Sequence, residues 1–567
     1  MGGGQSDILR GQLAARSADT GRLMCAMSLL QRIVGSPLPR RIADSVVTYY
    51  SRRRISQLNR LSTGDVQVRT LLRLLRQGRR TRFGNDHDFG RIRTVSDYQA
   101  RVPLREYEAF WQDYWQPAYP FLQDVTWPGM VPYFALSSGT TSGTTKYIPV
   151  SRQMLASNRR AALTMVAFYL DAHPSARLFA GRMFFLGGST DLQDVGARSA
   201  EADRNGTPRS SVWAGDLSGI ATREVSSLLR PYTFPPLDIA LLRDWDRKMQ
   251  VLAEESAKLP ITLIGGVPSW LLVLFERIKQ VTGRERIADV WPSLRVVVHG
   301  GTKFDPYRAL FRQAIGSDAV DFLEIYPASE GFIATEDLSH GLMRLIPDHG
   351  LFFEFVPVED LDKDRPARHT VENIETGVQY AVVVTTCAGL WSYVVGDTIC
   401  FEKRDPPLLR FTGRTKYFLS AFGEHVISEE VEKAVATAAE ICAAAVTDFH
   451  VGPVFPEDPA RPGRHRFLIE FARPPADLSH FTAELDAALG RLNEDYAAHR
   501  SGDLTMLAPE VRTVPRGGFA EWLRSKGKIG GQHKVPRMDN TGTISEEITH
   551  WLALGRGSHS GQSTSIG

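Results

Sequence analysis

The segment from Ser137 to Lys146, which reads SSGTTSGTTK, contains the residues best suited to bind an oxygen-rich anion. It holds seven hydroxyls, two glycines and one lysine, and no apolar side chain interrupts it. Glycines let the backbone approach a ligand closely, and amides, hydroxyls and the Lys146 ammonium can donate hydrogen bonds to phosphate oxygens. The segment does not match the Walker A pattern, which ends in Gly-Lys-Ser/Thr and opens a helix. It therefore predicts a phosphate loop of another type, with a flexible polar loop as the alternative.

Three later segments could complete a nucleotide site. In EIYPASE, Tyr326 offers a ring that can stack on a base, and Glu330 offers a carboxylate that can hold Mg²⁺. In WSYVVGD, Asp397 could accept hydrogen bonds from both ribose hydroxyls. The segment FTGRTKYF, residues 411–418, supplies Arg414 and Lys416. A lone Gly-Asp or Gly-Arg pair is more often a turn, so the order and spacing of these segments carry the interpretation.

Alternating strands and helices are expected to position these groups. Apolar runs predict strands on both sides of the Ser137 loop and strands that end near glycine pairs at 183–186, 261–264 and 294–298, with another at 322–326. Helical spacing predicts helices at 152–172, 236–258, 270–281 and 305–315, and the polar residues 190–235 predict mostly loop. This alternation is typical of an α/β domain with a largely parallel sheet, in which ligands bind at the carboxyl ends of the strands.

The second half of the chain predicts a strand-rich region and then a small module. Strands at 351–356, 379–386 and 397–401 predict a meander or a small barrel, and a helix, a strand and a helix at 429–445, 466–472 and 478–493 predict an α+β module. We therefore expect an α/β fold whose large N-terminal domain, residues 1–415, combines a parallel-sheet part with a strand-rich subdomain and begins with a helical basic lead-in, residues 1–80. A smaller, hinged α+β domain at 416–553 and a disordered tail at 554–567 are expected to follow.

Composition is that of a folded protein without a membrane span. The chain has 567 residues, of which 43% are hydrophobic and 23% charged, so two to four domains with ample core are expected. No apolar run approaches the length of a membrane span, and the opening MGGGQS lacks the apolar stretch of a signal peptide. The four cysteines are scattered without metal-ligand spacing. We therefore expect a cytoplasmic protein without a disulfide framework.

The charge is uneven, although the net charge is only +3. Residues 1–83 contain sixteen arginines, four acidic residues and no lysine, and such a basic arm can meet nucleic acid or anionic lipid. Aromatic residues are too sparse there for a base-stacking surface. We interpret these arginines as solvated side chains on amphipathic helices, and expect no nucleic-acid partner and no stable membrane association. Twelve lysines against fifty-five arginines indicate a GC-rich, bacterial genome.

The order of the motifs resembles that of the adenylate-forming superfamily, which includes acyl-CoA synthetases, peptide-synthetase adenylation domains and luciferases. Within it, the sequence most resembles the auxin-conjugating Gretchen Hagen family of acyl acid amido synthetases, and the bacterial branch of that family. The matching motifs are SSGTT-x-G with Lys146, YPASE at 326–330, GRTKYF at 413–418 and QHKVPR at 532–537. The resemblance runs from about residue 81 to Arg537.

The resemblance implies a two-step reaction with ATP and Mg²⁺ as cofactors. A carboxylic acid attacks the α-phosphorus of ATP and gives an acyl-AMP and pyrophosphate. An amine, expected to be an amino acid, then attacks the acyl carbon and releases AMP. Both steps need charge neutralisation at phosphate more than covalent catalysis. The small domain is expected to rotate on its hinge between the two steps.

The resemblance also implies roles for residues of this chain. Lys534, Lys416 and Glu330 would be catalytic, with Glu330 as the Mg²⁺ ligand and Lys534 as the mobile lysine that reaches the acyl-phosphate. The cofactor-binding residues would be Ser137, Ser138, Gly139, Thr140, Thr141, Lys146, Gly300, Gly301, Tyr326, Ser329, Asp397 and Arg414. His425 and His533 stand beside motif residues, and either could act as a general base toward the amine.

The sequence departs from the plant pattern at two positions. Ser392 and Val394 stand where plant members carry arginines ahead of the Gly-Asp pair, so the phosphate contacts of those arginines do not carry over. Two other functions stay open: an acyl-CoA ligase, which shares the first step, and a non-catalytic sensor of a nucleotide or an acyl acid. The identities of the acid and the amine also stay open, and a monomer is expected.

Overall fold

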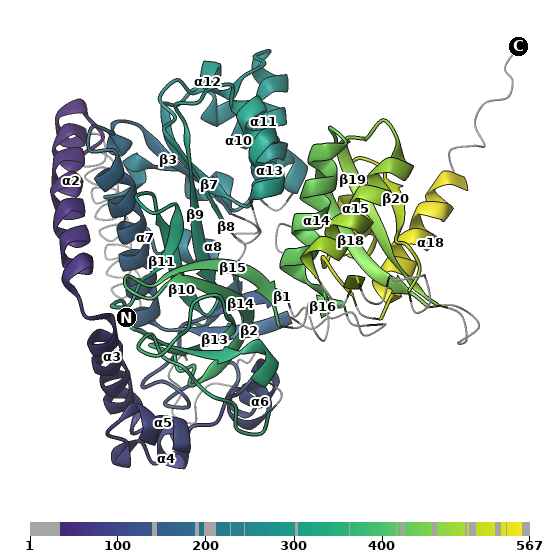
Figure 1. Cartoon of the computed structure of the whole chain (residues 1–567). Helices are drawn as coiled ribbons and strands as arrows, with labels where there is room; N and C mark the ends of the chain where they lie inside the picture. Colours follow the sequence, from purple (N-terminus) through teal and green to yellow (C-terminus); the bar gives the residue numbers. More distant parts are fainter. Residues whose placement is uncertain are drawn as a thin grey trace, which may run out of the picture.

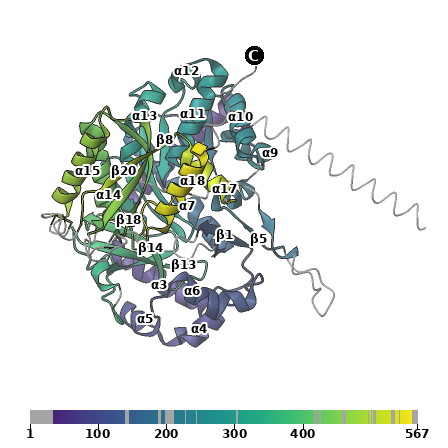
Figure 2. The same cartoon turned by 90° about the vertical axis from the view of Figure 1, so that its right-hand side faces the viewer.

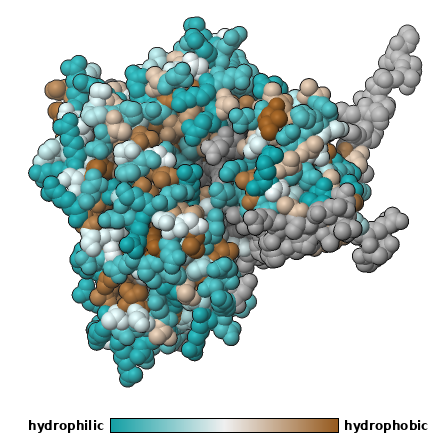
Figure 3. All heavy atoms as spheres, viewed as in Figure 1, coloured by the Kyte–Doolittle hydropathy of each residue, from teal (hydrophilic) through white to brown (hydrophobic). Residues whose placement is uncertain are grey.

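The structure is a computed structural model with a large domain and a smaller C-terminal lobe (Figure 1). It describes residues 34–138, 145–187, 192–197, 211–226, 228–242, 244–300, 304–361, 363–415, 418–419, 421, 426–455, 462–493, 496–497, 500, 506–527, 534–539 and 541–557. On the face seen in Figure 1 the surface is mainly hydrophilic, with separate hydrophobic patches (Figure 3).

One sheet of eleven strands runs through the large domain, in the order β12-β13-β14-β15-β11-β10-β9-β8-β7-β3-β6. The parallel part consists of β3 (Arg182–Leu186), β6 (Thr233–Phe234), β7 (Ile261–Gly266), β8 (Val296–Gly300) and β9 (Asp321–Ala328). The antiparallel part consists of β10 (Gly331–Asp337), β11 (Leu342–Leu345), β12 (Leu351–Pro357), β13 (Gln379–Thr386), β14 (Tyr393–Lys403) and β15 (Leu408–Arg414). The predicted α/β fold and the predicted meander are confirmed, but the meander continues the same sheet instead of forming a separate barrel.

Helices cover both faces of the parallel part, as the alternation of its buried residues requires. Phe184, Ile264 and Val297 face α10 (Trp245–Ser256), α11 (Pro268–Thr282) and α13 (Asp305–Ile315). Their neighbours Met183 and Leu263 face the opposite side, where α7 (Arg152–Ala172) packs and α2 (Pro37–Arg60) lies outside it (Figure 1). Short helices α9 (Leu237–Ala240) and α12 (Ile287–Val290) complete the first layer.

A second sheet carries the Ser137 loop. Its strand order is β2-β1-β5-β4, and β1 (Tyr133–Ser138) pairs antiparallel with β2 (Thr145–Val150). The other members are β4 (Gln193–Asp194) and β5 (Trp213–Gly215), followed by α8 (Leu217–Arg223). The sheet shares a large apolar core with strands of the meander and with four N-terminal helices: α3 (Thr63–Gly78), α4 (Arg82–Asp86), α5 (Val95–Arg101) and α6 (Tyr107–Phe110). The prediction that two strands flank the loop is confirmed.

The C-terminal lobe is built on a three-stranded sheet of β18 (Ala445–Val454), β19 (Arg464–Arg473) and β20 (Glu510–Val514). Phe467 and Ile469 face α14 (Ser428–Ile441) and α15 (Leu478–Leu492), whereas Leu468 faces α17 (Gly518–Ser525) and α18 (Thr543–Gly557). A two-stranded sheet, β16 (Phe418–Leu419) with β17 (Val426–Ile427), lies between β15 and α14. The lobe stands beside the large domain and meets it at α13 (Figure 1, Figure 2).

Most predicted elements appear with bounds close to those expected, and α7, α13 and β13 match them residue for residue. The single helix expected at 236–258 is divided into α9 and α10, because Asp244 caps a new helix by accepting a hydrogen bond from the Arg247 amide. Residues 190–235 were expected to be mostly loop, and their described part contains the short elements β4, β5, α8 and β6 between non-regular segments.

Several arginines of the basic lead-in are not simply solvated. The Arg40 guanidinium donates to the carbonyls of Phe179, Gly181 and Pro231. Arg54 forms a buried, two-bond ion pair with Asp348, at 2.6 and 2.7 Å. These contacts fix α2 to the large domain, so part of the positive charge has a structural role. Among the described residues, no helix is long and apolar enough to cross a membrane.

Acid is expected to destabilise the fold through buried histidines. His349 is 4% exposed, its Nε2 lies 2.6 Å from the Phe332 carbonyl oxygen, and burial lowers its pKa from 6.5 to about 4. The unfolded chain therefore binds a proton near pH 6.5 that the folded protein does not bind until about pH 4, so stability is full above pH 6.5 and is lost as the pH falls toward 4. Between pH 7.5 and 5, this residue alone should lower the free energy of unfolding by about 2 kcal/mol.

Urea unfolding at both pH values measures this effect. His349→Gln should show a smaller loss between pH 7.5 and 5 than the wild type, whatever its absolute stability. The matched control is His480→Gln, because that ring is exposed on α15. Equal losses in the wild type and His349→Gln would contradict the prediction.

Candidate functional site

The structure joins two of the predicted site residues directly. The Tyr326 hydroxyl on β9 donates a hydrogen bond to Oδ2 of Asp397 on β14, at 2.8 Å. Both residues are buried, with 7% and 5% of their surface exposed. The Tyr326 ring also packs edge-on against Phe411 of β15, with 5.5 Å between ring centroids. Residues that lie 71 positions apart in the sequence therefore form one polar contact inside the large domain.

This contact requires the sheet to curl. Three strands, β15, β11 and β10, stand between β14 and β9 in the strand order. Adjacent strands lie about 4.8 Å apart, so a flat sheet would separate β14 and β9 by about 19 Å. β15 pairs with β11 only through Leu408 and Leu409, and its remaining residues follow β14 instead. The free part of this strand pair can therefore cross to the end of β9.

A bulge in β14 aims Asp397 toward Tyr326. Val394 pairs with Val383, and Thr398 pairs with Ala381, so two extra residues are accommodated on β14 between these pairs. Gly396 lies in the bulge with a φ of 90°, a conformation that glycine adopts without strain. The sequence predicted that the strand begins at Asp397, but it runs from Tyr393 to Lys403 and contains the Gly-Asp pair.

Gly300 is the last residue of β8 and is required by close packing. A Cβ atom there would lie 2.4 Å from the carbonyl oxygen of Ile325 on β9. The strand end therefore places β8 against the strand that carries Tyr326, as the predicted adenine contact requires. Ser329 and Glu330 form the two-residue turn between β9 and β10, because Ala328 pairs with Gly331.

Glu330 is buried beside Tyr393. Only 7% of Glu330 is exposed. Burial, and then the adjacent Glu330 carboxylate, raise the pKa of Tyr393 well above its ordinary value. Glu108 and Tyr107 contribute to the same shift, so they lie near Tyr393 as well. This cluster joins the β9–β10 turn to α6.

Lys146 connects the cluster to the Ser137 loop. It is the register partner of Ser137 across β1 and β2, and its Nζ lies 5.5 Å from the centroid of the Tyr107 ring. The Tyr107 hydroxyl accepts a hydrogen bond from the Tyr147 amide, at 3.0 Å, which holds the ring against β2. Within the described part of the chain, no carboxylate lies in ion-pair distance of Lys146.

Several predicted positions lie outside the described residues: Gly139, Thr140, Thr141, Gly301, Lys416, His425 and His533. Only the backbone is described for Ser138 and for Arg414, whose Cα pairs with that of Asp397 across β14 and β15. Lys534 is exposed and belongs to the segment 534–539, which pairs with β18 of the C-terminal lobe.

The two positions that depart from the plant pattern do not face this site. Ser392 is fully buried with a φ of 46°, and its hydroxyl donates to Glu354, which forms a two-bond ion pair with Arg368 at 2.8 and 2.9 Å. Val394 packs in an apolar cluster with Val356 and other residues. An arginine could not enter either position without rearranging buried side chains.

Sequence reasoning missed His299, which precedes Gly300 on β8. It is 2% exposed and stacks on Phe304, with 3.8 Å between the rings. Burial, reinforced by Arg308, lowers its pKa to about 3, so the imidazole is neutral. The sequence feature that could have pointed to His299 is its position directly before a glycine pair at the end of a strand. Tyr107 and Tyr393 were also missed, because nothing local marks them as neighbours of Glu330.

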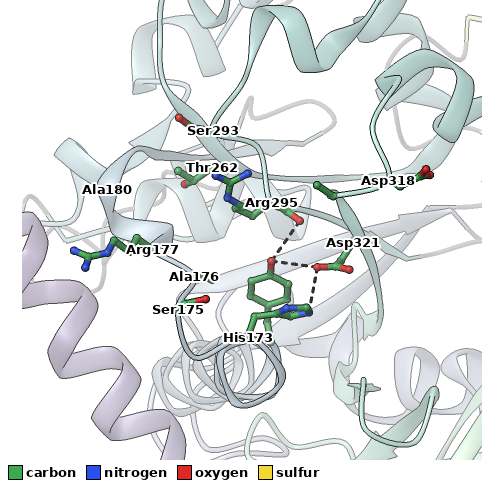
Figure 4. Close-up of a pocket in the computed structure, with 12 residues that line it drawn as sticks. His173, Ser175, Ala176, Arg177, Ala180, Thr262, Ser293, Arg295, Asp318 and Asp321 are labelled. Atoms are coloured by element: carbon green, nitrogen blue, oxygen red, sulfur yellow. Dashed lines mark hydrogen bonds and ion pairs between the residues drawn. The ribbon is translucent and has the colours of Figure 1, made fainter.

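A separate hollow lies at the other ends of the parallel strands (Figure 4). Its volume is about 650 Å³, and its lining includes Thr262, Arg295 and Asp321, which lie at or near the starts of β7, β8 and β9. There, Asp321 accepts a hydrogen bond from Tyr169 at 3.3 Å and pairs with His173 at 3.2 Å. These contacts tie the end of α7 to β9, and none of the predicted site residues lines the hollow.

Three family models match most of the chain. The GH3 family N-terminal domain matches residues 54–320, the GH3 family central domain matches residues 344–414, and the GH3 family C-terminal domain matches residues 429–543. The chain belongs to the GH3 family. The predicted family resemblance is thereby confirmed.

Curated relatives of this GH3 chain are plant enzymes with moderate identity. It is 27% identical over 198 residues to "Indole-3-acetic acid-amido synthetase GH3.3" of Arabidopsis thaliana, covering 33% of each chain. It is 26% identical over 279 residues to "Jasmonoyl--L-amino acid synthetase GH3.5" of Oryza sativa subsp. japonica, covering 45% of this chain and 47% of the relative. The matches thus span about a third to a half of the length of these relatives.

Solved structures share the fold of this GH3 chain. "AtGH3.15 acyl acid amido synthetase in complex with 2,4-DB" superposes with a TM-score of 0.72 at 17% identity, covering 88% of this chain and 96% of that one. A 2-hydroxyisobutyryl-CoA ligase in the postadenylation state superposes with a TM-score of 0.54 at 12% identity, covering 87% and 91%. Both solved structures therefore share the overall fold of this chain.

The Tyr326–Asp397 contact should stabilise the curled sheet measurably. Tyr326→Phe removes one hydrogen bond to a buried carboxylate and keeps the ring, so it should lower the free energy of unfolding by about 1.5–3 kcal/mol. Chemical denaturation at pH 7.5 measures the change. Tyr49→Phe, at a tyrosine that is 59% exposed on α2, is the matched control and should change little. A Tyr326→Phe protein as stable as the control would show that the contact adds nothing to the sheet.

Proposed function

We propose that the chain is an ATP-dependent acyl acid amido synthetase. It would adenylate a carboxylic acid with release of pyrophosphate and then transfer the acyl group to an amine, most simply an amino acid. The observation that carries the proposal is the contact of Tyr326 with Asp397 in a GH3 fold, together with a neighbouring cluster that links Glu330 through Tyr393 and Tyr107 to Lys146. Its relatives are named as amido synthetases of indole-3-acetic acid and of jasmonate with amino acids.

In this proposal the large domain binds the nucleotide. Asp397, whose Oδ2 is fixed by Tyr326, holds the ribose, and Gly300, Gly301, Tyr326 and Ser329 frame the adenine. Ser137 and Ser138 at the end of β1, Gly139, Thr140 and Thr141 after it, and Lys146 of β2 bind the phosphates, because amides, hydroxyls and an ammonium complement oxygen anions.

The residues present fit a Mg²⁺ ion that is held chiefly by phosphate. The described residues contain no group of three or more side chains able to form a metal cage. Mg²⁺ in nucleotide enzymes commonly uses one or two carboxylates together with substrate phosphates, and Glu330 can supply one. When bound, the ion would neutralise phosphate charge during transfer.

The C-terminal lobe supplies the second part of the machinery in this proposal. We divide the chain into an adenylation domain, residues 1–415, a mobile domain, residues 416–553, and a tail, residues 554–567, with Arg414 and Lys416 at the hinge. Gly413 has a φ of 149°, and a Cβ there would lie 2.8 Å from the Ser428 side chain at the start of α14. The connection thus packs closely on the lobe that carries Lys534, the lysine proposed to reach the acyl-phosphate.

From the sequence we also propose that the protein is a bacterial, cytoplasmic monomer that acts on small molecules. An acyl-CoA ligase is the alternative, since one such enzyme shares the fold. The match of residues 429–543 to the GH3 family C-terminal domain favours amide formation.

The direct test is acid-dependent exchange of labelled pyrophosphate into ATP across a library of carboxylic acids. Each acid is then incubated with ATP and either an amino-acid mixture or CoA. Exchange followed by amide products is expected. Thioester without amide would establish the acyl-CoA ligase instead, and ATP binding without exchange for any acid would favour a nucleotide sensor.

Lys534→Ala should lower acid-dependent exchange about 100-fold or more, because one cation that stabilises developing charge is lost, while ATP still binds. Equilibrium binding of ATP and the exchange rate are measured together. The control is Lys433→Ala, which removes an exposed lysine from α14 of the same lobe. Undiminished exchange in Lys534→Ala would remove this lysine from the first step.

A further inference from the structure

The segment that carries Lys534 is fastened alongside β18 by a parallel β-bridge between Val451 and Met538. The Val451 amide donates to the Arg537 carbonyl at 2.8 Å, and the Asp539 amide donates to the Val451 carbonyl at 3.0 Å. Nδ1 of His450 lies 2.6 Å from the Pro536 carbonyl oxygen. Because the backbone of residues 534–539 is held at these points, the direction of its side chains is set by the orientation of the whole lobe.

Arg537 extends from this segment to the large domain. Within the lobe, its guanidinium pairs with Asp448 and lies over the Phe449 ring, 4.5 Å from the centroid. Its Nη2 donates to the Tyr307 hydroxyl on α13, at 3.3 Å. Tyr307 is 2% exposed, so the contact is shielded from water. One side chain of the lobe thus bridges to a buried tyrosine of the large domain.

The two ends of this bridge lie close in sequence to two parts of the proposed site. Tyr307 follows Gly300 by seven residues, in the helix that leaves β8. Arg537 follows Lys534 by three residues, which is about 10 Å along an extended segment. The bridge therefore ties the nucleotide side of the large domain to the lysine proposed to act in adenylation.

We propose that the Arg537–Tyr307 hydrogen bond is a latch that holds the lobe in the orientation that serves adenylation and is released for the transfer step. Arg537 and Tyr307 are positioning residues in this inference, which rests on the proposed function. Among the described contacts of Arg537, the bond to Tyr307 is the one that crosses to the large domain, whereas Asp448 and Phe449 belong to the lobe and move with Arg537. A retained partner keeps the guanidinium satisfied in both orientations, so the latch can open reversibly.

A second bridge between the two domains is weaker. Arg524 of α17 lies 3.9 Å from Asp246 of α10, and their side chains are 50% and 71% exposed. Exposed ion pairs of this kind contribute little. This pair therefore serves as a control for the latch.

Tyr307→Phe is the decisive variant, because it removes the hydroxyl and keeps the ring in the core. Acid-dependent pyrophosphate exchange should fall about tenfold, the effect of one lost hydrogen bond. Amide formation from chemically prepared acyl-AMP and an amino acid should be unchanged or faster. Arg537→Lys should likewise lower pyrophosphate exchange and leave amide formation unchanged. The double variant should show no further loss of exchange.

The controls are Arg524→Ala and Tyr232→Phe, which should leave both steps unchanged. Tyr232 is a buried tyrosine whose hydroxyl bonds to the Val34 carbonyl, away from the lobe. Unchanged exchange in Tyr307→Phe, or equal loss in both steps, would overturn the latch.

A measurement of the position of the lobe, which does not depend on catalysis, tests the latch separately from the proposed function. Fluorescence energy transfer between dyes at Glu285→Cys and His480→Cys, in a chain whose Cys25, Cys400 and Cys442 are serine, reports the position of the lobe. Tyr307→Phe should shift the transfer distribution toward a second population, and Tyr232→Phe should not. If the parent chain shows no exchange with any acid, the proposed function fails, and the transfer distribution alone decides whether the latch exists.

Discussion

The hydrogen bond between Tyr326 and Asp397 depends on a curled sheet, and the rest of the proposed site depends on the same curl. β9 and β14 are four steps apart in the strand order, yet their side chains meet at 2.8 Å. Short pairing of β15 with β11 allows the antiparallel part to fold over the ends of the parallel strands. The β14 bulge with Gly396 then turns Asp397 toward Tyr326. A flatter sheet would leave the tyrosine and the carboxylate about 19 Å apart.

Several charged side chains of this protein lie inside buried ion pairs and not in the sequence motifs. Arg54 and Arg368 are paired with Asp348 and Glu354 inside the large domain, where an unpaired ion would be costly. Ser392 belongs to the Arg368 network, so a position that carries arginine in the plant pattern has become part of the core. Lys146 differs from these arginines, since it points toward an aromatic ring without an ion-pair partner among the described residues. The ammonium of Lys146 is therefore suited to bind an anionic ligand.

Among the described residues, polar side-chain contacts link the two domains. At α13 the link uses a shielded hydrogen bond from Arg537 to Tyr307, and elsewhere an exposed ion pair. Apolar cores stay within each domain, because Phe467 and Leu468 face helices of the lobe itself. Domains joined in this way can change orientation without exposing a core. Such an arrangement fits the proposed function, in which two half-reactions need different positions of Lys534.

The sequence by itself determined what depends on neighbours along the chain. Periodicity gave the bounds of α7 and α13, the run at Ser137–Lys146 marked a loop between two strands, and motif order identified the family. Only the tertiary structure decided which distant side chains meet: Tyr326 with Asp397, Glu330 with Tyr393, and Arg537 with Tyr307. It also decided that the meander joins the main sheet. Local sequence cannot fix such features, because strand register, sheet curl and domain docking follow from contacts between residues far apart in the chain.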